Sequence, residues 1–509
     1  MNWTSFTDCL PGADIQAPWW EWLSVGGVLH LVFFLLVLMH CLRRRREAPA
    51  TLLWIFVAWA FPFIGPLVYL AFGIDRVPQK VFSKYRKDQA LWKELKARNA
   101  ETLPLAYWRA VHEAVADIPR GAPGHRFNRA VDSMLSHHPL LDGNRIAPLV
   151  NGDETYPEMI KAIRSAGHHI HLQSFIIGSD ATGRMFMDLL AEKAREGVTV
   201  RLLYDRFGCT KAILSGFFRK YRRIPNFHMA GWTLANPLRR QFQVNLRNHR
   251  KCLIVDGRLA FTGGINLSDD NITSAERPAI RDYHFEVAGP IVQELQYTFL
   301  RDWYFITDED PDHFLQEVYF PQLPSIGTAR VRQVDSGPSH VSEVLTDVYF
   351  AAIVSARNDL LIVTPYFIPN RDLVRALRAA ALRGVNVRLI VPQKNNHFYA
   401  GLAGRALYEE LLEAGVRIFE RKPPFLHAKA LIVDDSAALV GTANFDVRSF
   451  RLNYESTLAV FDTDFCNRLK PIILCDLAES GEIMLSEWAK RPARRKMLEN
   501  LAFLMMPAL

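Results

Sequence analysis

Cysteine is scarce in this sequence and shows no functional spacing. The 509 residues include six cysteines, with no Cys-X-X-Cys pair and no regular interval between them. A disulfide framework or a cysteine-based zinc site needs such spacing, so the sequence predicts neither. The pattern favours a reducing compartment.

The N-terminal region lacks the signals of a cleaved secretory peptide. Asp8 and Asp14 precede the first apolar segment, residues 22–42, and four arginines at 43–46 follow it. A secretory signal carries its positive charges before the apolar run and a small-residue cleavage site after it, and this sequence has neither. We therefore interpret residues 22–42 as a membrane helix that stays attached to the protein.

Charged residues are also absent from residues 51–74, a second apolar segment. It is long enough to cross a hydrocarbon core of about 30 Å. Basic residues at 43–46 and again at 76–87 both favour the cytoplasmic side, which a single crossing between them cannot satisfy. Because Pro62, Gly65 and Pro66 lie mid-segment, we predict either a re-entrant hairpin or a second spanning helix.

What the sequence does contain is the motif His-X-Lys-X4-Asp, present twice. The two copies are His249-Arg-Lys251-Cys-Leu-Ile-Val-Asp256 and His427-Ala-Lys429-Ala-Leu-Ile-Val-Asp434. In both copies the residues after the lysine are apolar and favour a β-strand. The strand period of two then places the histidine and the lysine on one face.

An imidazole beside an ammonium group suits phosphoryl transfer. Neutral histidine can attack phosphorus or move a proton, while lysine supplies positive charge for the non-bridging oxygens. One histidine cannot be nucleophile and acid at once. Two copies can divide the work, one imidazole forming a phosphohistidine while the other protonates the leaving alkoxide and then deprotonates the incoming nucleophile.

Further polar residues follow each motif. Asn266 and Asn444 each come shortly after a glycine-containing turn, and their amides are predicted to bind the phosphate. A carboxylate is expected to bond the second nitrogen of each imidazole and fix its tautomer. Asp282 and Glu455 are the candidates for that role.

These stretches resemble the phospholipase D superfamily and, within it, the bacterial cardiolipin synthases. The stretches that carry the resemblance are residues 248–256, 262–266, 289–290, 364–367, 426–429 and 441–450. The resemblance covers nearly the whole chain. It implies that both motifs meet in one site without a metal or other cofactor, and that Asp256 and Asp434 belong to the catalytic set with the histidines and lysines.

The resemblance also implies an activity. It is the transfer of a phosphatidyl group between two phosphatidylglycerol molecules, which gives cardiolipin and glycerol. His249 would take the phosphatidyl group and His427 would protonate glycerol. One alternative is a hydrolytic phospholipase D, or a phosphatidyltransferase with another acceptor alcohol. Another is a membrane-bound phosphodiesterase or nuclease.

The charge of the chain bears on these alternatives. A net charge of +8 suits either nucleic acid or an anionic membrane surface. With an apolar anchor present, we predict phosphatidylglycerol and anionic membrane lipids as partners, and no nucleic acid. The expected location is the bacterial inner membrane, with the catalytic domains in the cytoplasm. Homo-oligomerisation is left open.

An internal repeat predicts the domain organisation. Residues 159–205 and 351–392 both show helix, strand, helix, glycine and strand in that order. We predict an α/β fold of two phospholipase D-like α-β-α domains in pseudo-twofold arrangement, preceded by a transmembrane or re-entrant helical hairpin. The expected parts are an anchor (1–75), a basic, largely helical connector (76–140), a first domain (141–306), a linker (307–340) and a second domain with a basic C-terminal segment (341–509).

Overall fold

The structure is a computed structural model that describes most of the chain in two units, Met1–Pro78 and Gln79–Leu509. The described residues are 19–43, 48–73, 107–108, 111–135, 138–232, 235–236, 241–242, 247–314, 316–337 and 344–504. The arginines at 44–46 and the basic residues at 76–87, both used in the topology prediction, lie outside them. Each unit is considered by itself.

The first unit begins with a long apolar helix, α1 (Trp19–Arg43). Its stretch Gly26–Arg43 has a mean hydropathy of 1.9 and is, within the described residues, the one helix long and apolar enough to cross a membrane. The helix rises about 1.5 Å per residue, which makes it longer than a hydrocarbon core of about 30 Å. The first predicted membrane segment is thus one continuous helix.

The second apolar segment is a broken helix that turns back on itself. Helix α2 (Ala48–Ala60) stops before Pro62, and Phe63 has a positive φ of 59°. Helix α3 (Ile64–Val68) and the π-helical turn η1 (Tyr69–Gly73) follow. Proline cannot continue the hydrogen-bond ladder of a helix, which explains the break.

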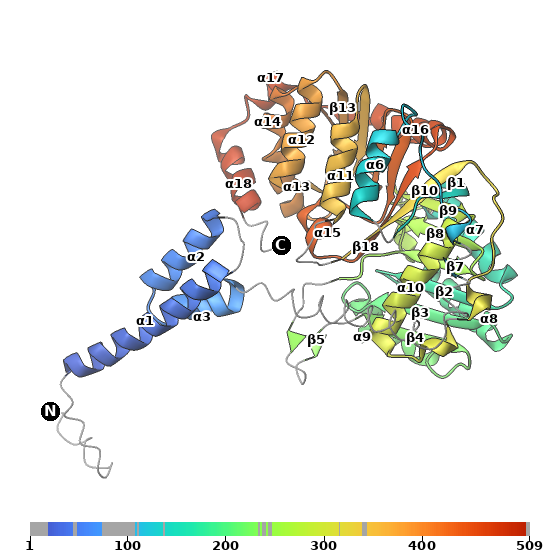
Figure 1. Ribbon diagram of the computed structural model, residues 1–509, viewed down its shortest axis with the longest axis horizontal. Coiled ribbons are helices and arrows are strands. Elements are labelled where there is room, and N and C mark those ends of the chain that lie inside the picture. Colours follow the sequence, from blue (N-terminus) through green and yellow to red (C-terminus); the bar gives the residue numbers. More distant parts are fainter. Residues whose placement is uncertain are drawn as a thin grey trace, which may run out of the picture. The chain divides into compact units, whose positions relative to one another are not determined.

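Ring contacts establish the direction of the returning part. The ring of Trp59, at the end of α2, lies 5.0 Å from that of Phe34 in the middle of α1. Tyr69 lies beside Trp54 in α2, with ring centroids 5.5 Å apart, and its hydroxyl is 2.6 Å from Nδ1 of His40 near the end of α1. The chain after Pro62 therefore runs back along α2, toward the end of α1 from which α2 started (Figure 1).

The second unit is built on one sheet of 15 strands. In spatial order these are β19 (Ser480–Glu482), β14 (Arg417–Arg421), β13 (Asn386–Pro392), β11 (Asp359–Val363), β15 (Ala430–Val433), β16 (Ala437–Gly441), β18 (Glu455–Phe461), β10 (Ala329–Ser336), β1 (Leu141–Val150), β9 (Tyr283–Ala288), β8 (Leu259–Gly263), β7 (Cys252–Val255), β2 (His169–Ser174), β3 (Thr199–Asp205) and β4 (Phe227–Trp232). From the β10–β1 junction outward, each strand on one side has a counterpart on the other, except the edge strand β19. The sheet thus consists of two halves in pseudo-twofold arrangement.

The junction between the halves differs from the predicted linker. Strand β10 lies within residues 307–340, yet it pairs with β18 on one edge and with β1 on the other, where Val331 is opposite Leu141. The residues before β10 include several Asp and Pro, and this composition is why the sequence predicts a linker over residues 307–340. The pairing partners of β10 are distant in sequence, so only the tertiary structure reveals that it joins the halves.

Helices cover both faces of the sheet. In the first half these are α7 (Asn151–Ser165), α8 (Ala181–Arg195) and α10 (Ile291–Thr307), and in the second α11 (Val344–Ser355), α12 (Arg371–Leu382) and α16 (Thr463–Ala478) (Figure 1). Strand β2 shows why both faces are covered. Ile170 and Leu172 join the core with α7 and α8, whereas His171 and Gln173 bond Gln296 and Asp302 of α10. Alternate residues of a strand face opposite sides of the sheet.

The predicted repeat is present with small shifts at its boundaries. Helices α8 and α12 are capped in the same way, by Asp180 accepting from the Gly183 amide and Asn370 accepting from the Leu373 amide. Such caps satisfy backbone donors at a helix start, so α8 begins at Ala181, ahead of its apolar stretch. In the predicted connector, the described part contains helix α6 (His125–Met134), which packs on α11, whereas residues 76–106 lie outside the description.

Candidate active site

Each motif ends in a central strand of its half. Strand β7 pairs with β2 and β8, and β15 pairs with β11 and β16, so both are enclosed on two edges. The histidine and lysine of each motif come immediately before these strands. Lys251 and Lys429 are buried, with relative exposures of 2% and 3%. The motif side chains therefore lie inside the protein, where charges interact more strongly than in water.

The two halves exchange backbone hydrogen bonds at the motifs. Asn248 forms a parallel bridge with Tyr454, and the His249 amide donates to the Tyr454 carbonyl at 2.9 Å. In the same way the His427 amide donates to the Arg281 carbonyl at 2.7 Å. Each histidine is thus positioned by the segment of the other half, directly beside the carboxylate that follows.

Those carboxylates contact the imidazoles in crossed order. Nδ1 of His249 lies 3.0 Å from Oε2 of Glu455, and Nδ1 of His427 lies 2.7 Å from Oδ2 of Asp282. Both carboxylate side chains are fully buried. The histidine of each half is therefore paired with a carboxylate from the other, and neither half alone provides both groups. The sequence identified the two carboxylates as candidates but contained no information on which histidine each one faces.

The surroundings of the two carboxylates differ. Glu455 accepts hydrogen bonds from three side chains, those of Thr442, Ser449 and Asn453. Asp282 accepts from the amide of Tyr283 at 2.8 Å. The position that corresponds to Thr442 is Gly264, and a Cβ there would lie 2.1 Å from the Asp282 carboxylate. Glycine is thus required beside Asp282 because any side chain would displace the carboxylate.

The charges around the carboxylates hold them ionised. Burial alone would raise the pKa of Asp282 and of Glu455. For Asp282, Lys429 and His427 outweigh that effect, and for Glu455 His249 and Lys251 do so. The pKa of each carboxyl group therefore lies below its ordinary value. Each imidazole faces a fixed negative charge, which favours the proton on Nδ1. Nε2 of His249 is then available for chemistry, whereas Nε2 of His427 lies 3.0 Å from Lys429 Nζ.

The lysines titrate near neutral pH. Burial lowers the pKa of Lys251 to about 7, and repulsion from Lys429 acts in the same direction. Burial lowers the pKa of Lys429 to about 8, against the attraction of Asp282 and Glu455. Both motifs share one site through the crossed histidine–carboxylate pairs, and the charge of Lys429 accordingly acts on Lys251. Two cations forced together in a buried place favour an anionic ligand between them.

Both imidazoles are neutral at pH 7. Burial and the adjacent Lys429 lower the pKa of His427 to about 4, although Asp282 opposes them. Burial also lowers the pKa of His249, against the opposing effect of Glu455. A neutral imidazole with its Nδ1 proton held by a carboxylate is the form that can attack phosphorus.

The predicted asparagines are buried near the motif turns. Oδ1 of Asn266 accepts from the amide of Ile176 at 3.1 Å, which leaves the NH2 group of its side chain as a donor. The Asn444 backbone amide donates to Ser449, the residue that also bonds Glu455. Asn444 thus belongs to the same hydrogen-bond network as His249, through Ser449 and Glu455, whereas Asn266 is buried without such a link among the described residues.

The motif aspartates are not brought to this cluster. Asp256 follows β7 and accepts from the backbone amides of Gly167, His168 and His169 at 2.8 Å each. Asp434 makes the same three contacts with residues 357, 358 and 359. These side chains lie at the opposite end of the motif strands from the histidines. Their position supports a role in holding β2 and β11 in register, and it gives no support to the predicted catalytic role.

Aromatic rings border both histidines, and no separate signal in the sequence pointed to them. The ring of Phe175 lies 5.0 Å from that of His249, and Nζ of Lys251 lies 5.4 Å from the centroid of the Phe175 ring. On the other side the rings of Phe425 and Tyr366 lie 5.9 and 6.5 Å from that of His427. Tyr366 lies in residues 364–367, one of the stretches that resemble the phospholipase D superfamily. Its position beside His427 follows only from the fold.

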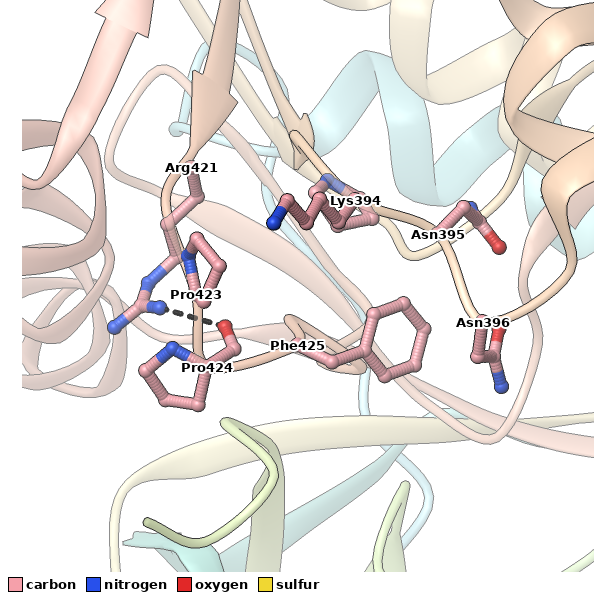
Figure 2. Close-up of a pocket in the computed structure, with 8 residues that line it drawn as sticks. Lys394, Asn395, Asn396, Arg421, Pro423, Pro424 and Phe425 are labelled. Carbon is pink, nitrogen blue, oxygen red and sulfur yellow. Dashed lines mark hydrogen bonds between the residues drawn. The ribbon is translucent and has the colours of Figure 1, made fainter. Parts of the chain in front are cut away.

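A pocket opens next to the second histidine. Its volume is about 290 Å³, and it is lined by Pro392, Lys394, Asn395, Asn396, Arg421, Pro423, Pro424 and Phe425. Figure 2 shows the segment 394–396 on one side and the segment 423–425 on the other. Since Phe425 also borders His427, the pocket adjoins the site. Lys394, Asn395, Asn396 and Arg421 supply polar groups to a lining that is otherwise apolar.

Comparison with known proteins agrees with this geometry. A family model described as the phospholipase D-like domain of cardiolipin synthase matches residues 159–303 and 349–473. A cardiolipin synthase of Geobacillus thermodenitrificans is 35% identical over 91% of this chain and 90% of its own length. The chain belongs to the cardiolipin synthase family. Within that family, cardiolipin synthase 1 of Bacillus cereus is 34% identical over 96% of this chain and 92% of its own length.

The family assignment extends to the N-terminal unit and to the fold. A model described as the phospholipase D-nuclease N-terminal region matches residues 32–73. A phosphatidylserine synthase from Haemophilus influenzae superposes with a TM-score of 0.58 over 75% of this chain and 98% of that chain, at 16% identity. At that identity the likeness concerns the fold. The predicted phospholipase D-like α/β architecture of this cardiolipin synthase family member is confirmed.

Proposed function

We propose that the protein makes cardiolipin by phosphatidyl transfer between two phosphatidylglycerol molecules. The single observation that carries the proposal is the crossed site, in which two histidines are each paired with a carboxylate of the other half. Such a site supplies a nucleophile and an acid together, which a two-step transfer requires. Membership of the cardiolipin synthase family supports the same reaction.

In the first step Nε2 of His249 attacks the phosphorus of one phosphatidylglycerol. A bond forms from phosphorus to nitrogen, and the bond from phosphorus to the glycerol headgroup oxygen breaks. His427 gives a proton to that oxygen, and glycerol leaves. His427 is neutral in the free protein and takes up this proton from solvent when the negative charge of the bound phosphodiester raises its pKa; the second step returns a proton to it.

In the second step the phosphohistidine is resolved. A hydroxyl group of the second phosphatidylglycerol loses its proton to His427, and its oxygen attacks phosphorus. The bond from phosphorus to His249 breaks, which gives cardiolipin and restores both imidazoles. Glu455 stabilises the positive charge on His249 during both steps, because its carboxylate is 3.0 Å from Nδ1.

The charge that builds up on the phosphate oxygens is met by side chains of the site. Lys251 and Lys429 provide positive charge, and the amides of Asn266 and Asn444 add donors. A preorganised donor of this kind is worth about 3 to 4 kcal/mol in a dry site. Turnover without a metal ion follows as a prediction, since these four groups address the same oxygens that a metal would.

Analysis of the products tests the proposal. Purified full-length protein is incubated with phosphatidylglycerol vesicles, with and without a chelator, and lipids and glycerol are measured by mass spectrometry. Equal amounts of cardiolipin and glycerol are expected in both samples. Phosphatidic acid in place of cardiolipin would instead identify a hydrolase, in which water resolves the phosphohistidine. An unchanged lipid would contradict both readings, and activity lost with the chelator would contradict the metal-free mechanism.

We further propose that the second apolar segment is re-entrant, so that the catalytic unit lies on the cytoplasmic side of the inner membrane. Support comes from α2, whose 13 residues rise about 20 Å, less than a hydrocarbon core of about 30 Å. The turn at Pro62 and the return of Tyr69 toward His40 bring the chain back toward the side it left. Basic residues before and after the segment can then stay on one side.

An exposed native cysteine provides the test. Cys475 is exposed in the second half, whereas Cys41, Cys209, Cys252 and Cys466 are buried. In a Cys9→Ser background, a membrane-impermeant maleimide applied to intact cells should leave Cys475 unlabelled, and permeabilised cells should show labelling. The matched control is Cys475→Ser, which removes the signal. Labelling of Cys475 in intact cells would place the catalytic unit outside and refute the re-entrant arrangement.

A further inference from the structure

The last helix of the chain carries an exposed apolar face. Helix α18 (Ala493–Leu504) packs on α13 (Phe398–Arg405) through Ala502 and Phe503, which join a small core with Ala400 and Ala403. The opposite side of α18 presents large side chains to solvent. Their exposed fractions are 71% for Met497, 56% for Leu498, 56% for Leu501 and 74% for Leu504. Positions 497, 501 and 504 have the spacing of one helix face.

Positive charge borders this face. Lys490 and Arg494 are exposed, whereas Arg491 and Lys496 of the same basic run form ion pairs with Glu499 and Glu409. An apolar helix face edged by cations has the chemistry of a helix that lies in the headgroup layer of an anionic bilayer. Charge complementarity therefore argues for a lipid surface as the occupant of this face.

A row of rings leads from α13, the helix on which α18 packs, to the active site. Phe398, the first residue of α13, is 75% exposed, and its ring lies 5.8 Å from that of Tyr399. The row continues to His397 at 5.5 Å and then to Tyr366 at 5.7 Å. Tyr366 borders His427 at 6.5 Å. An amphipathic molecule can follow this row with its apolar part against the rings.

The pocket beside His427 lies at the end of the same path. The Tyr366 hydroxyl donates to Oδ1 of Asn396 at 2.7 Å, which joins the ring row to the pocket wall formed by Lys394, Asn395 and Asn396 (Figure 2). Its volume of about 290 Å³ is at the lower limit of the roughly 300 to 1,000 Å³ typical of small-molecule sites. The pocket suits a headgroup, and the acyl chains must stay outside it.

We propose that the α18 face, defined as Met497, Leu498, Leu501 and Leu504, docks on the surface of an anionic phospholipid bilayer, and that lipid then passes Phe398 of α13 to reach His427. The acyl chains stay in the bilayer at the α18 face, the glycerol backbone passes the rings of Tyr399 and Tyr366, and the polar headgroup enters the pocket at Lys394 and Asn396. This inference rests on the proposed function and adds to it the surface by which substrate enters.

Substrate form separates docking from chemistry. The full-length protein with Met497→Glu is compared with wild type on long-chain phosphatidylglycerol in vesicles and on a short-chain phosphatidylglycerol dissolved as monomers. The matched control is Leu382→Glu, since Leu382 is 72% exposed and lies at the end of α12 away from its contact with α18. A charge at position 497 should oppose insertion of the face into the bilayer.

The expected result is a loss of about tenfold in kcat/KM on vesicles for Met497→Glu, from the burial that the side chain forfeits, with kcat/KM on monomers unchanged. Leu382→Glu should match wild type on both. Equal activity of Met497→Glu and wild type on vesicles would overturn the docking face. Membrane binding would then be assigned to the N-terminal helices, or the α18 face to contact with a second copy of the chain. An equal loss on vesicles and monomers would also overturn the docking face. Failure of wild type to make cardiolipin from either form would instead refute the proposed function.

Discussion

At the scale of single residues, the crossed pairing with carboxylates makes the two histidines members of one active site. His249 and His427 lie in different halves, yet each depends on a carboxylate of the other half. Groups that act as a unit do not contribute additively to turnover. The site residues are therefore best distinguished by variants that remove one function and leave the geometry intact.

The first prediction concerns these histidines. His249→Ala and His427→Ala should each reduce cardiolipin formation by several orders of magnitude, and the double variant should be no worse than either, because each step needs both imidazoles. The measurement is single-turnover conversion of phosphatidylglycerol. Retention of phosphatidyl label on the protein by His427→Ala, but not by His249→Ala, would assign the nucleophile to His249. The reverse distribution would exchange the roles.

The second prediction is an alkaline limit set by the lysines. Lysine stabilises phosphate charge only when protonated, so kcat/KM should fall as the pH rises through about 7 and about 8, the pKa values of Lys251 and Lys429 in the free protein. In Lys251→Arg the cation no longer titrates in this range, and the descending limb should move to higher pH even if the maximum rate is lower. If the descending limb of the pH profile of kcat/KM stayed at the same pH in both Lys251→Arg and Lys429→Arg, a group other than these lysines would set the alkaline limit.

At the scale of elements, the two ends of each motif strand have different roles. The histidine and lysine of the site lie at its start, and an aspartate that binds backbone amides lies at its end. The histidine and lysine at the start of β7 point into the site, while Asp256 at its end accepts three backbone amides. Burial would raise the pKa of Asp256, but those hydrogen bonds outweigh it and the pKa is lowered. Asp434 accepts the corresponding three backbone amides, so in both halves an aspartate holds the neighbouring strand in place.

The third prediction follows from that separation. Asp256→Ala should lower the free energy of unfolding by about 1 to 3 kcal/mol, because the exposed amide of Gly167 and the part-buried amides of His168 and His169 lose their acceptor. Turnover per folded molecule should stay close to wild type. Because the folded-state pKa is depressed, this stabilisation is present above the ordinary pKa near 4 and disappears as the pH falls through the folded value. A stable Asp256→Asn protein without turnover would restore the catalytic role.

At the scale of the whole molecule, the sheet binds the two halves into one catalytic unit. Strand β10 pairs with β1 across the junction, and Arg250 adds ion pairs to Asp302 of α10 and Asp335 of β10. The core clusters of both halves lie within this unit, as do all strands of the sheet. Its fold therefore does not depend on the apolar helices that precede it.

The fourth prediction concerns those helices. Deletion of residues 1–74 should leave the thermal unfolding of the catalytic unit unchanged, while turnover on phosphatidylglycerol vesicles falls and becomes steeply dependent on salt. The remaining attraction to the membrane would come from the α18 face and from basic residues, and its electrostatic part is screened within about 8 Å at physiological ionic strength. Turnover of monomeric short-chain lipid is the internal control and should be retained. Full activity of the truncated protein on vesicles at high salt would show that the helices do not position the site.

The sequence by itself determined the chemistry and the repeat of this protein. Two His-X-Lys-X4-Asp motifs, each before an apolar run, identified the histidines, the lysines and the strands, because local pattern reports both residue type and strand period. The same pattern predicted the α/β halves and the long apolar helix α1. Proline and glycine in residues 51–74 marked the place where the second apolar segment bends.

Only the tertiary structure decided which groups meet. Glu455 faces His249 and Asp282 faces His427 because the halves cross at the motifs, and no local pattern encodes a contact between residues so far apart in the chain. The same holds for β10, whose partners β1 and β18 belong to different halves. Asp256 and Asp434 share a motif with the histidines, but a strand carries its two ends to opposite places. Proximity in sequence therefore fixed the residue types, and the packing of the two halves assigned their roles.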